Sequence, residues 1–161
     1  MKLSRRSWLK INTNELKLFK GDIERILPQR EPFLFVDEIT DVVPGESVTG
    51  KKTFTGKEDF FKGHFPQMPI VPGVIMVELA AQVSAFMILT VPKYRSLFGF
   101  LAGVDKFRFF RKVVPGQTLI VESRLISFRH SVARSECKIH SSDSLVAHGV
   151  IAAVFVDTET L

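Results

Sequence analysis

The feature that most constrains this chain is a long apolar run between two prolines. A stretch of 19 mostly apolar residues, 73–91, lies between Pro72 and Pro92. Proline suits the first turn of a helix but cannot continue one, so the run predicts a helix that begins near Pro72 and stops before Pro92.

A run of this length could span a bilayer or lie inside a protein. Glu78, Gln82 and Ser84 interrupt it, and a carboxylate within a membrane span costs roughly 2.5 kcal/mol or more. We therefore expect no membrane span. The pattern indicates a helix that other parts of the same chain cover.

The segments around this helix predict a sheet. Between 132 and 140 the residues alternate with the two-residue period of a half-buried strand, and the run 145–156 is apolar enough to be covered on both faces. We expect a short helix over 21–27 and a loop over 57–72 with one helical turn near 58–61. Strands are expected at 33–43, 47–55, 97–110, 118–128, 131–141 and 145–157.

These elements predict an α+β fold with an antiparallel sheet of about six strands curled around one central helix. Residues 1–20 are interpreted as a basic extension and 21–161 as a single domain. The 15 phenylalanines could fill the core or form the wall of an apolar ligand tunnel.

Charge and cysteine content exclude some classes of protein. The net charge is +5, but the basic residues are scattered and match no nucleic-acid-binding motif, so we expect no nucleic-acid partner. A single cysteine, Cys137, excludes an internal disulfide and fits a reducing compartment. No apolar run of signal-peptide length follows the basic start, which favours a cytoplasmic location.

Two residues could transfer protons. His64 lies in a proline-rich loop, and Glu78 lies near the start of the apolar helix. Burying a carboxylate is costly, so Glu78 calls for a reason. Ala81, Gln82 and Ala85 share its helix face. The two small alanines leave room beside the carboxyl group, and Gln82 could hydrogen-bond it from one turn on. A buried ion pair between Glu78 and an arginine, and a purely turn-capping His64, remain alternatives.

The start of the helix could polarise a carbonyl group. Backbone N–H groups near Gly73 would be unpaired donors there, and a residue without a side chain lets a substrate approach. The sequence holds no metal-ligand cluster, phosphate-binding loop, dinucleotide fingerprint or nucleophile elbow. We expect neither a metal nor a cofactor, and we expect Cys137 to serve packing.

Three blocks in order give a specific resemblance. HFPQMPIVPGVIMVELAAQ, ILPQREPFLFVDEI and FLAGVDKFRFFRKVVPGQTL resemble the motifs of the beta-hydroxyacyl-acyl carrier protein dehydratases of FabZ type, over residues 22–157. The resemblance implies a hot dog fold. This chain has Gln29 and Glu31 where the family usually has histidine and tyrosine, and Lys112 where it often has proline. Glu78 replaces the aspartate usual in the FabA-type dehydratase-isomerases, which favours dehydration alone.

The resemblance also implies roles. His64 would take the proton from C2 of a (3R)-hydroxyacyl thioester. Glu78 would help protonate the departing C3 hydroxyl group, directly or through water, to give a trans-2-enoyl thioester in fatty-acid biosynthesis. Gly73 would bind the thioester carbonyl, and Gln82 would orient Glu78. The candidate substrate-binding residues are Gly73, Gln82, Phe65 and Pro72.

The implied partners are an acyl carrier protein and further copies of the chain. The two catalytic side chains would come from different protomers of a homodimer, within a trimer of dimers. Arg108, Arg111 and Lys112 could dock the acidic carrier protein. Two other functions stay open, a hot dog acyl thioesterase and a non-catalytic acyl-binding protein.

Overall fold

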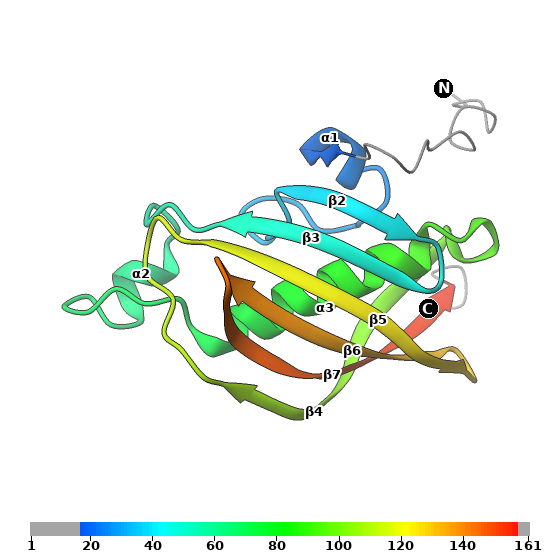
Figure 1. Ribbon diagram of the computed structural model, residues 1–161. Coiled ribbons are helices and arrows are strands. Elements are labelled where there is room, and N and C mark those ends of the chain that lie inside the picture. Colours follow the sequence, from blue (N-terminus) through cyan, green and yellow to red (C-terminus); the bar gives the residue numbers. More distant parts are fainter. Residues whose placement is uncertain (1–16, 158–161) are drawn as a thin grey trace.

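The computed structural model describes residues 17–157 (Figure 1). One long helix, α3, lies against a sheet, and short helices and turns connect the remaining strands. The elements in chain order are β1 (Leu18–Phe19), α1 (Lys20–Ile23), β2 (Glu38–Val43), β3 (Ser47–Thr53), α2 (Phe60–Gly63), α3 (Gly73–Leu89), a 3₁₀ turn η1 (Pro92–Tyr94), β4 (Leu97–Phe109), β5 (Thr118–Arg129), β6 (Val132–Ser141) and β7 (Ser144–Asp157).

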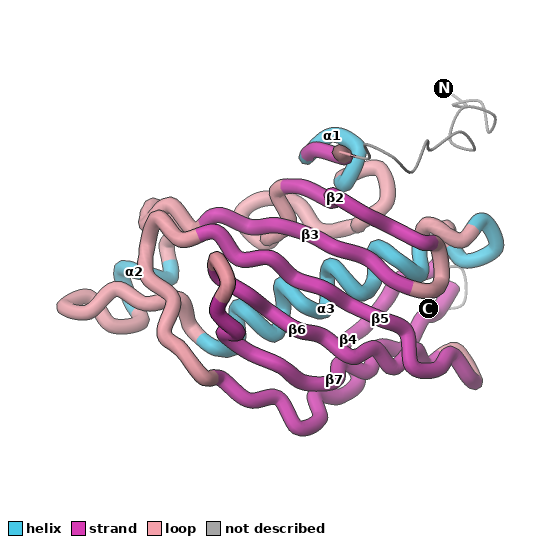
Figure 2. The backbone as a smooth tube through the Cα atoms, in the orientation of Figure 1, coloured by secondary structure: helices cyan, strands magenta, loops and turns pink. Residues whose placement is uncertain are grey.

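The sheet has seven strands in the order β1-β2-β3-β5-β6-β7-β4, and every neighbouring pair is antiparallel. The sheet curves around α3. In the view of Figures 1 and 2, the strands pass in front of this helix. The α+β architecture predicted from sequence is therefore confirmed. The strand beyond the expected six is the two-residue β1, which pairs with the start of β2.

Helix α3 begins and ends where the prolines predict. Pro72 is its N-cap residue and Thr90 its C-cap residue, with Pro92 opening the following 3₁₀ turn. Ten of its residues are buried, among them Leu79, Ala80 and Val83. Among residues 17–157, no helix is both long and apolar enough to cross a membrane.

Helix α3 is not buried all round. Val74 is 74% exposed near its first turn, and Glu78, Ala81 and Ala85 are only half-buried. The side of the helix that carries Glu78 is therefore left partly open by the chain's own sheet.

Strand β2 begins at Glu38, five residues later than the predicted start at 33. Phe33 and Phe35 do not pair with a strand, because their backbone groups hydrogen-bond the side chain of Gln82 on α3. The prediction failed here because an apolar run can also lie against a helix. Helix α1 is likewise shorter than the predicted 21–27, and the residues after Ile23 form turns.

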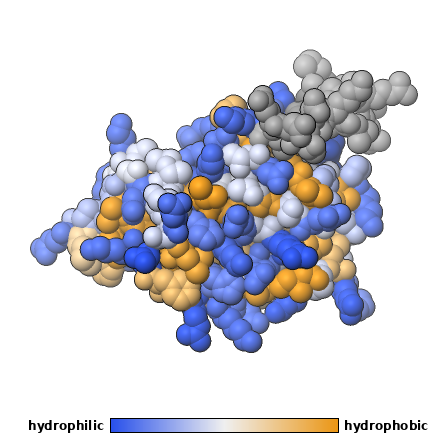
Figure 3. All heavy atoms as spheres, in the orientation of Figure 1, coloured by the Kyte–Doolittle hydropathy of each residue, from blue (hydrophilic) through white to orange (hydrophobic). Residues whose placement is uncertain are grey.

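The outer face of β7 also differs from the prediction. Ile151 and Phe155 are buried in the core, but Val150 and Val154 on the other face are only half-buried. The apolar outer face of this strand is not fully covered by the described chain. Hydrophilic side chains cover most of the face seen in Figure 3, with hydrophobic groups between them.

The buried cluster between α3 and the sheet contains a small polar group. Ser84 donates to the carbonyl of Ala80 at 2.7 Å and contacts Ser123 at 2.8 Å and the thiol of Cys137 at 3.3 Å. Burial raises the pKa of the Cys137 thiol, which is consistent with a packing role. Of the phenylalanines, Phe54, Phe86 and Phe155 are fully buried.

The predicted N-terminal extension falls mainly outside the described residues, which start at Lys17. Leu18 and Phe19 belong to the sheet and Lys20 to α1. The division into an extension over 1–20 and one domain over 21–161 stays a prediction.

Candidate active site

His64 directly follows the short helix α2, of which it is the C-cap residue. Its backbone N–H donates to the carbonyl of Phe60 at 2.8 Å, and its Nδ1 lies 3.2 Å from the carbonyl oxygen of Ile70. A carbonyl only accepts, so this bond requires the proton on Nδ1. In the neutral imidazole, Nε2 then keeps a free lone pair, which is the form a general base needs.

The ring of His64 is half-buried and lies against Phe65. The two ring centroids are 4.0 Å apart with an interplanar angle of 34°. Phe65 itself is 49% exposed. The ring of Phe65 thus supports the imidazole, while about half of the Phe65 side chain remains exposed.

Glu78 lies one turn into α3, half-buried, and its Oε1 accepts a hydrogen bond from Nε2 of Gln82 at 2.9 Å. Burial raises the pKa of the Glu78 carboxyl above its usual value, and the hydrogen bond from Gln82 partly offsets this rise. Within residues 17–157 no arginine or lysine pairs with Glu78. The alternative of a buried Glu78–arginine ion pair is therefore wrong for this part of the chain.

Gln82 orients the carboxyl group of Glu78, and the hydrogen bonds of the Gln82 amide allow only one orientation of that amide. It is 1% exposed, its Oε1 accepts from the N–H of Phe35 at 2.9 Å, and its Nε2 donates to the carbonyl of Phe33 at 2.8 Å. An N–H must face an oxygen and a carbonyl must face a nitrogen, so the amide cannot be reversed. The NH₂ group necessarily points at Glu78 as well.

Gly73 is the first residue of α3, behind Pro72. Its backbone N–H has no partner among the described residues, as expected for the first turn of a helix. A Cβ built at Gly73 would lie 3.1 Å from Cζ of Phe109 on β4. Glycine therefore allows the edge strand to approach this donor closely.

The structure brings some predicted residues together and leaves others apart. Gln82 contacts Glu78, and Phe65 contacts His64, but no hydrogen bond joins His64 to Glu78 within the described chain. The two proton-transfer groups belong to different elements, the end of α2 and the body of α3.

The basic residues predicted to dock a carrier protein lie on or after β4. Arg108 pairs in register with His148 of β7, and Arg111 and Lys112 follow the strand. None of the three side chains has an ion pair or hydrogen bond among residues 17–157. The same region contains no group of three or more His, Cys, Asp or Glu side chains that could hold a metal.

The sequence did not reveal the backbone partners of Gln82 or the contact between Phe109 and Gly73. Phe33 and Phe35 are 49 and 47 residues from Gln82. Their proximity depends on the fold, and no local pattern could have indicated it. The available signal was Gln82 itself, because an amide buried on an apolar helix needs hydrogen-bond partners elsewhere in the chain.

A comparison with known proteins gives concordant matches. A family model described as a FabA-like domain matches residues 27–150. The 3-hydroxyacyl-[acyl-carrier-protein] dehydratase FabZ of Syntrophomonas wolfei is 41% identical over 135 residues, which are 84% of this chain and 94% of that protein. The FabZ protein of Desulforamulus reducens is 43% identical over 125 residues, 78% and 88% of the two chains.

Solved structures agree in fold. The dehydratase heterocomplex ApeI:P from Xenorhabdus doucetiae matches with a TM-score of 0.73 at 18% identity, over 85% of this chain and 92% of that one. At this identity the match supports the fold alone.

Proposed function

The chain belongs to the FabZ-type branch of the FabA-like dehydratase family, and on this basis we propose that it is a 3-hydroxyacyl-acyl carrier protein dehydratase with the hot dog fold. It removes water from (3R)-hydroxyacyl thioesters and gives trans-2-enoyl thioesters in fatty-acid biosynthesis. The observation in the site that carries this proposal is the carboxyl group of Glu78, which has a raised pKa, an amide donor and, among residues 17–157, no cation beside it.

In the proposed reaction His64 is the base. Its Nε2 takes the proton from C2, and the electron pair of the broken C–H bond forms the C2–C3 double bond. The Nδ1 bond to the carbonyl of Ile70 supports this role, because it keeps the imidazole in one tautomer.

Glu78 is the proposed acid. As the C3–O bond breaks, the protonated carboxyl gives its proton to the hydroxyl group, which leaves as water. The raised pKa supports this role, because a larger fraction of the carboxyl stays protonated at a given pH. His64 ends the step protonated and Glu78 ionised, and one proton passed from the first to the second restores the site.

The remaining site residues are proposed to bind and orient the substrate. The free N–H of Gly73 would donate to the thioester carbonyl and stabilise the negative charge that develops there. Gln82 would hold Glu78 in place, while Phe65 and Pro72 would line the approach. The open side of α3 beside Glu78 and the exposed ring of Phe65 support this arrangement.

We further propose that the working unit is a homodimer with shared sites, assembled as a trimer of dimers. Strand β4 is an edge of the sheet, and apolar side chains are exposed along it. A second copy would cover these side chains and bring its own His64 or Glu78 to the site. The exposed apolar residues of β4 are Phe98, Phe100, Leu101, Val104 and Phe109.

We also propose a cytoplasmic location and docking of an acidic carrier protein near Arg108, Arg111 and Lys112. The unpaired state of these cations in the described chain supports docking. The single thiol, buried at Cys137, is consistent with a reducing compartment.

The function is tested by incubating the purified protein separately with a 3-hydroxyacyl thioester and with the matching 2-enoyl thioester. Enoyl absorbance should reach the same equilibrium from both sides, without release of free thiol. Thiol release would instead identify a thioesterase, and no change with either thioester would identify a binding protein.

A further inference from the structure

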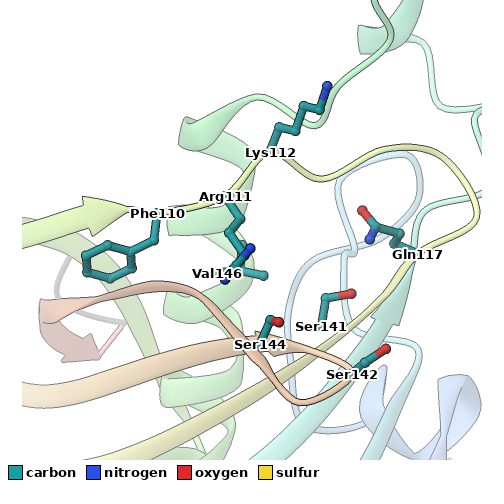
Figure 4. Close-up of a pocket in the computed structure, with 8 residues that line it drawn as sticks. All are labelled: Phe110, Arg111, Lys112, Gln117, Ser141, Ser142, Ser144 and Val146. Carbon is teal, nitrogen blue, oxygen red and sulfur yellow. The ribbon is translucent and has the colours of Figure 1, made fainter.

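A groove separate from His64 and Glu78 lies at the end of the sheet that carries the β6–β7 turn (Figure 4). Its volume is about 550 Å³, within the range of small-molecule sites. One wall is the segment that joins β4 to β5, and the other is the turn between β6 and β7. The residues that line it are Phe110, Arg111, Lys112, Gln117, Ser141, Ser142, Ser144 and Val146.

The lining favours an anion. Arg111 has no acidic partner within the described chain, and Figure 4 shows its guanidinium reaching toward Ser144 and Val146. The hydroxyl groups of Ser141 and Ser144 add further potential donors. Lys112 points away from the turn in the same view, so it lies at the rim. Asp143, the acidic residue between Ser142 and Ser144, is exposed at the turn and does not line the groove.

Two backbone hydrogen bonds and one chain segment connect the groove to the candidate active site. The N–H of Phe110 donates to the carbonyl of Val146 at 2.8 Å, which holds one wall against the other. Two residues after Arg111, the carbonyl of Val113 accepts from the N–H of Val71 at 2.8 Å. Val71 directly precedes Pro72 and Gly73, where the thioester carbonyl is proposed to bind. One segment thus joins the anion groove to the start of α3.

We propose that this groove binds the phosphodiester group through which an acyl carrier protein holds its pantetheine arm, an inference that rests on the proposed function. Arg111 pairs with the two charged phosphate oxygens, and the hydroxyl groups of Ser141 and Ser144 donate to further lone pairs of the same two oxygens. A phosphodiester fits better than a carboxylate, because its oxygens are arranged tetrahedrally around phosphorus and can meet donors from both walls of a concavity, whereas the two oxygens of a carboxylate lie in one plane. The arm then leads from the groove along the 110–113 segment toward Gly73.

The first test is a calorimetric titration with two probes that differ only in the phosphate, phosphopantetheine and pantetheine. The wild-type protein should bind phosphopantetheine about tenfold or more tightly than pantetheine, as expected for a charge-assisted contact. Arg111→Gln should remove this preference and leave pantetheine binding unchanged. Arg95→Gln, an equal charge change beyond the other end of α3, should keep it. Equal binding of the two probes by the wild type, or a preference that survives Arg111→Gln, overturns the proposal.

The second test separates the phosphodiester from the carrier protein's acidic surface. Arg111→Gln should weaken binding of carrier protein that bears the arm and leave binding of carrier protein without the arm unchanged. Equal weakening of both would show that Arg111 contacts the protein surface and would overturn the proposal. Neither test uses dehydration, so a protein that prefers the phosphate but turns over no hydroxyacyl thioester would refute the proposed function alone.

Discussion

At the scale of single residues, the candidate site depends on two side chains whose hydrogen bonds fix the position of a proton or the orientation of an amide. The carbonyl of Ile70 assigns the proton of His64 to Nδ1, and the backbone of Phe33 and Phe35 assigns the orientation of the Gln82 amide. Each assignment fixes what the reacting atom can do. Nε2 of His64 can accept a proton, and Glu78 receives an N–H donor.

His64→Ala should lower dehydration by about 10²–10⁴-fold, the usual contribution of general acid–base catalysis. The fold should survive, because within the described part of the chain the side chain makes a single hydrogen bond, to the carbonyl of Ile70. The measurement is kcat of the purified variant, with a thermal melt to check folding. Near-normal turnover would refute the role of His64 as base.

Glu78→Gln should abolish most turnover while substrate binding survives, because an amide keeps the shape but has no acidic proton. Glu78→Asp should keep partial activity with a shortened reach. The pKa of Glu78 is raised, so its protonated form persists to higher pH, and dehydration should fall as the pH rises through that pKa. Steady-state kinetics over a pH series checks both statements, and a more active Gln than Asp variant would contradict the acid role.

Gln82→Leu should lower stability by roughly 1–3 kcal/mol for each buried partner left unpaired, as measured by urea unfolding. It should also shift the alkaline limit of activity to higher pH, because the bond from Gln82 lowers the pKa of Glu78. Ser84→Ala is the matched control, since it removes a buried hydroxyl of the same helix that does not contact Glu78. An unshifted pH profile in Gln82→Leu would reduce Gln82 to a structural role.

At the scale of elements, a bulge in the edge strand β4 determines how closely β4 approaches its neighbour β7. The register between β4 and β7 shifts between Asp105 and Arg108, and Lys106 has a φ of 50° within this bulge. A bulge places an extra residue opposite one residue of the partner strand. Phe107 is pressed against Gly149 as a result, and a Cβ at Gly149 would lie 2.5 Å from Cα of Phe107.

Gly149→Ala should therefore destabilise the protein by about 1–3 kcal/mol or more, because the obstacle includes backbone that cannot rotate away. Gly103→Ala on the neighbouring strand is the control. A Cβ there meets only Cβ of Ala152, at an ordinary 3.6 Å, so its effect should stay within about 0.5 kcal/mol. Chemical denaturation of the two variants measures the difference, and equal stability would show that the bulge relaxes.

Much of this architecture was predictable from sequence, and the failures have physical causes. The two prolines and the apolar run were sufficient to predict α3, because both are local signals. The start of β2 was predicted five residues early, since Phe33 and Phe35 give their hydrogen bonds to Gln82 in place of a strand. Gln82 was predicted to contact Glu78 from their four-residue spacing. The groove at Arg111 was not predicted, because its walls come from segments about 30 residues apart.

At the scale of the whole molecule, one copy of the chain exposes an apolar edge strand and an open side of its central helix. If sites are shared, mixing His64→Ala and Glu78→Ala proteins under conditions of subunit exchange should restore activity. Half of the randomly formed dimers are mixed and each holds one intact site, so about a quarter of wild-type activity is expected. Native mass spectrometry verifies the mixed dimers, and mixed dimers without activity would contradict shared sites.

The exposed edge of β4 also has a genetic consequence. With shared sites, a chain that lacks both His64 and Glu78 would disable each normal copy it joins, because every site in the mixed dimer would miss one group. A chain that lacks only one of the two would spare one site of each mixed pair. The double defect would be dominant and the single defects largely recessive, even though all of them occur in the same chain.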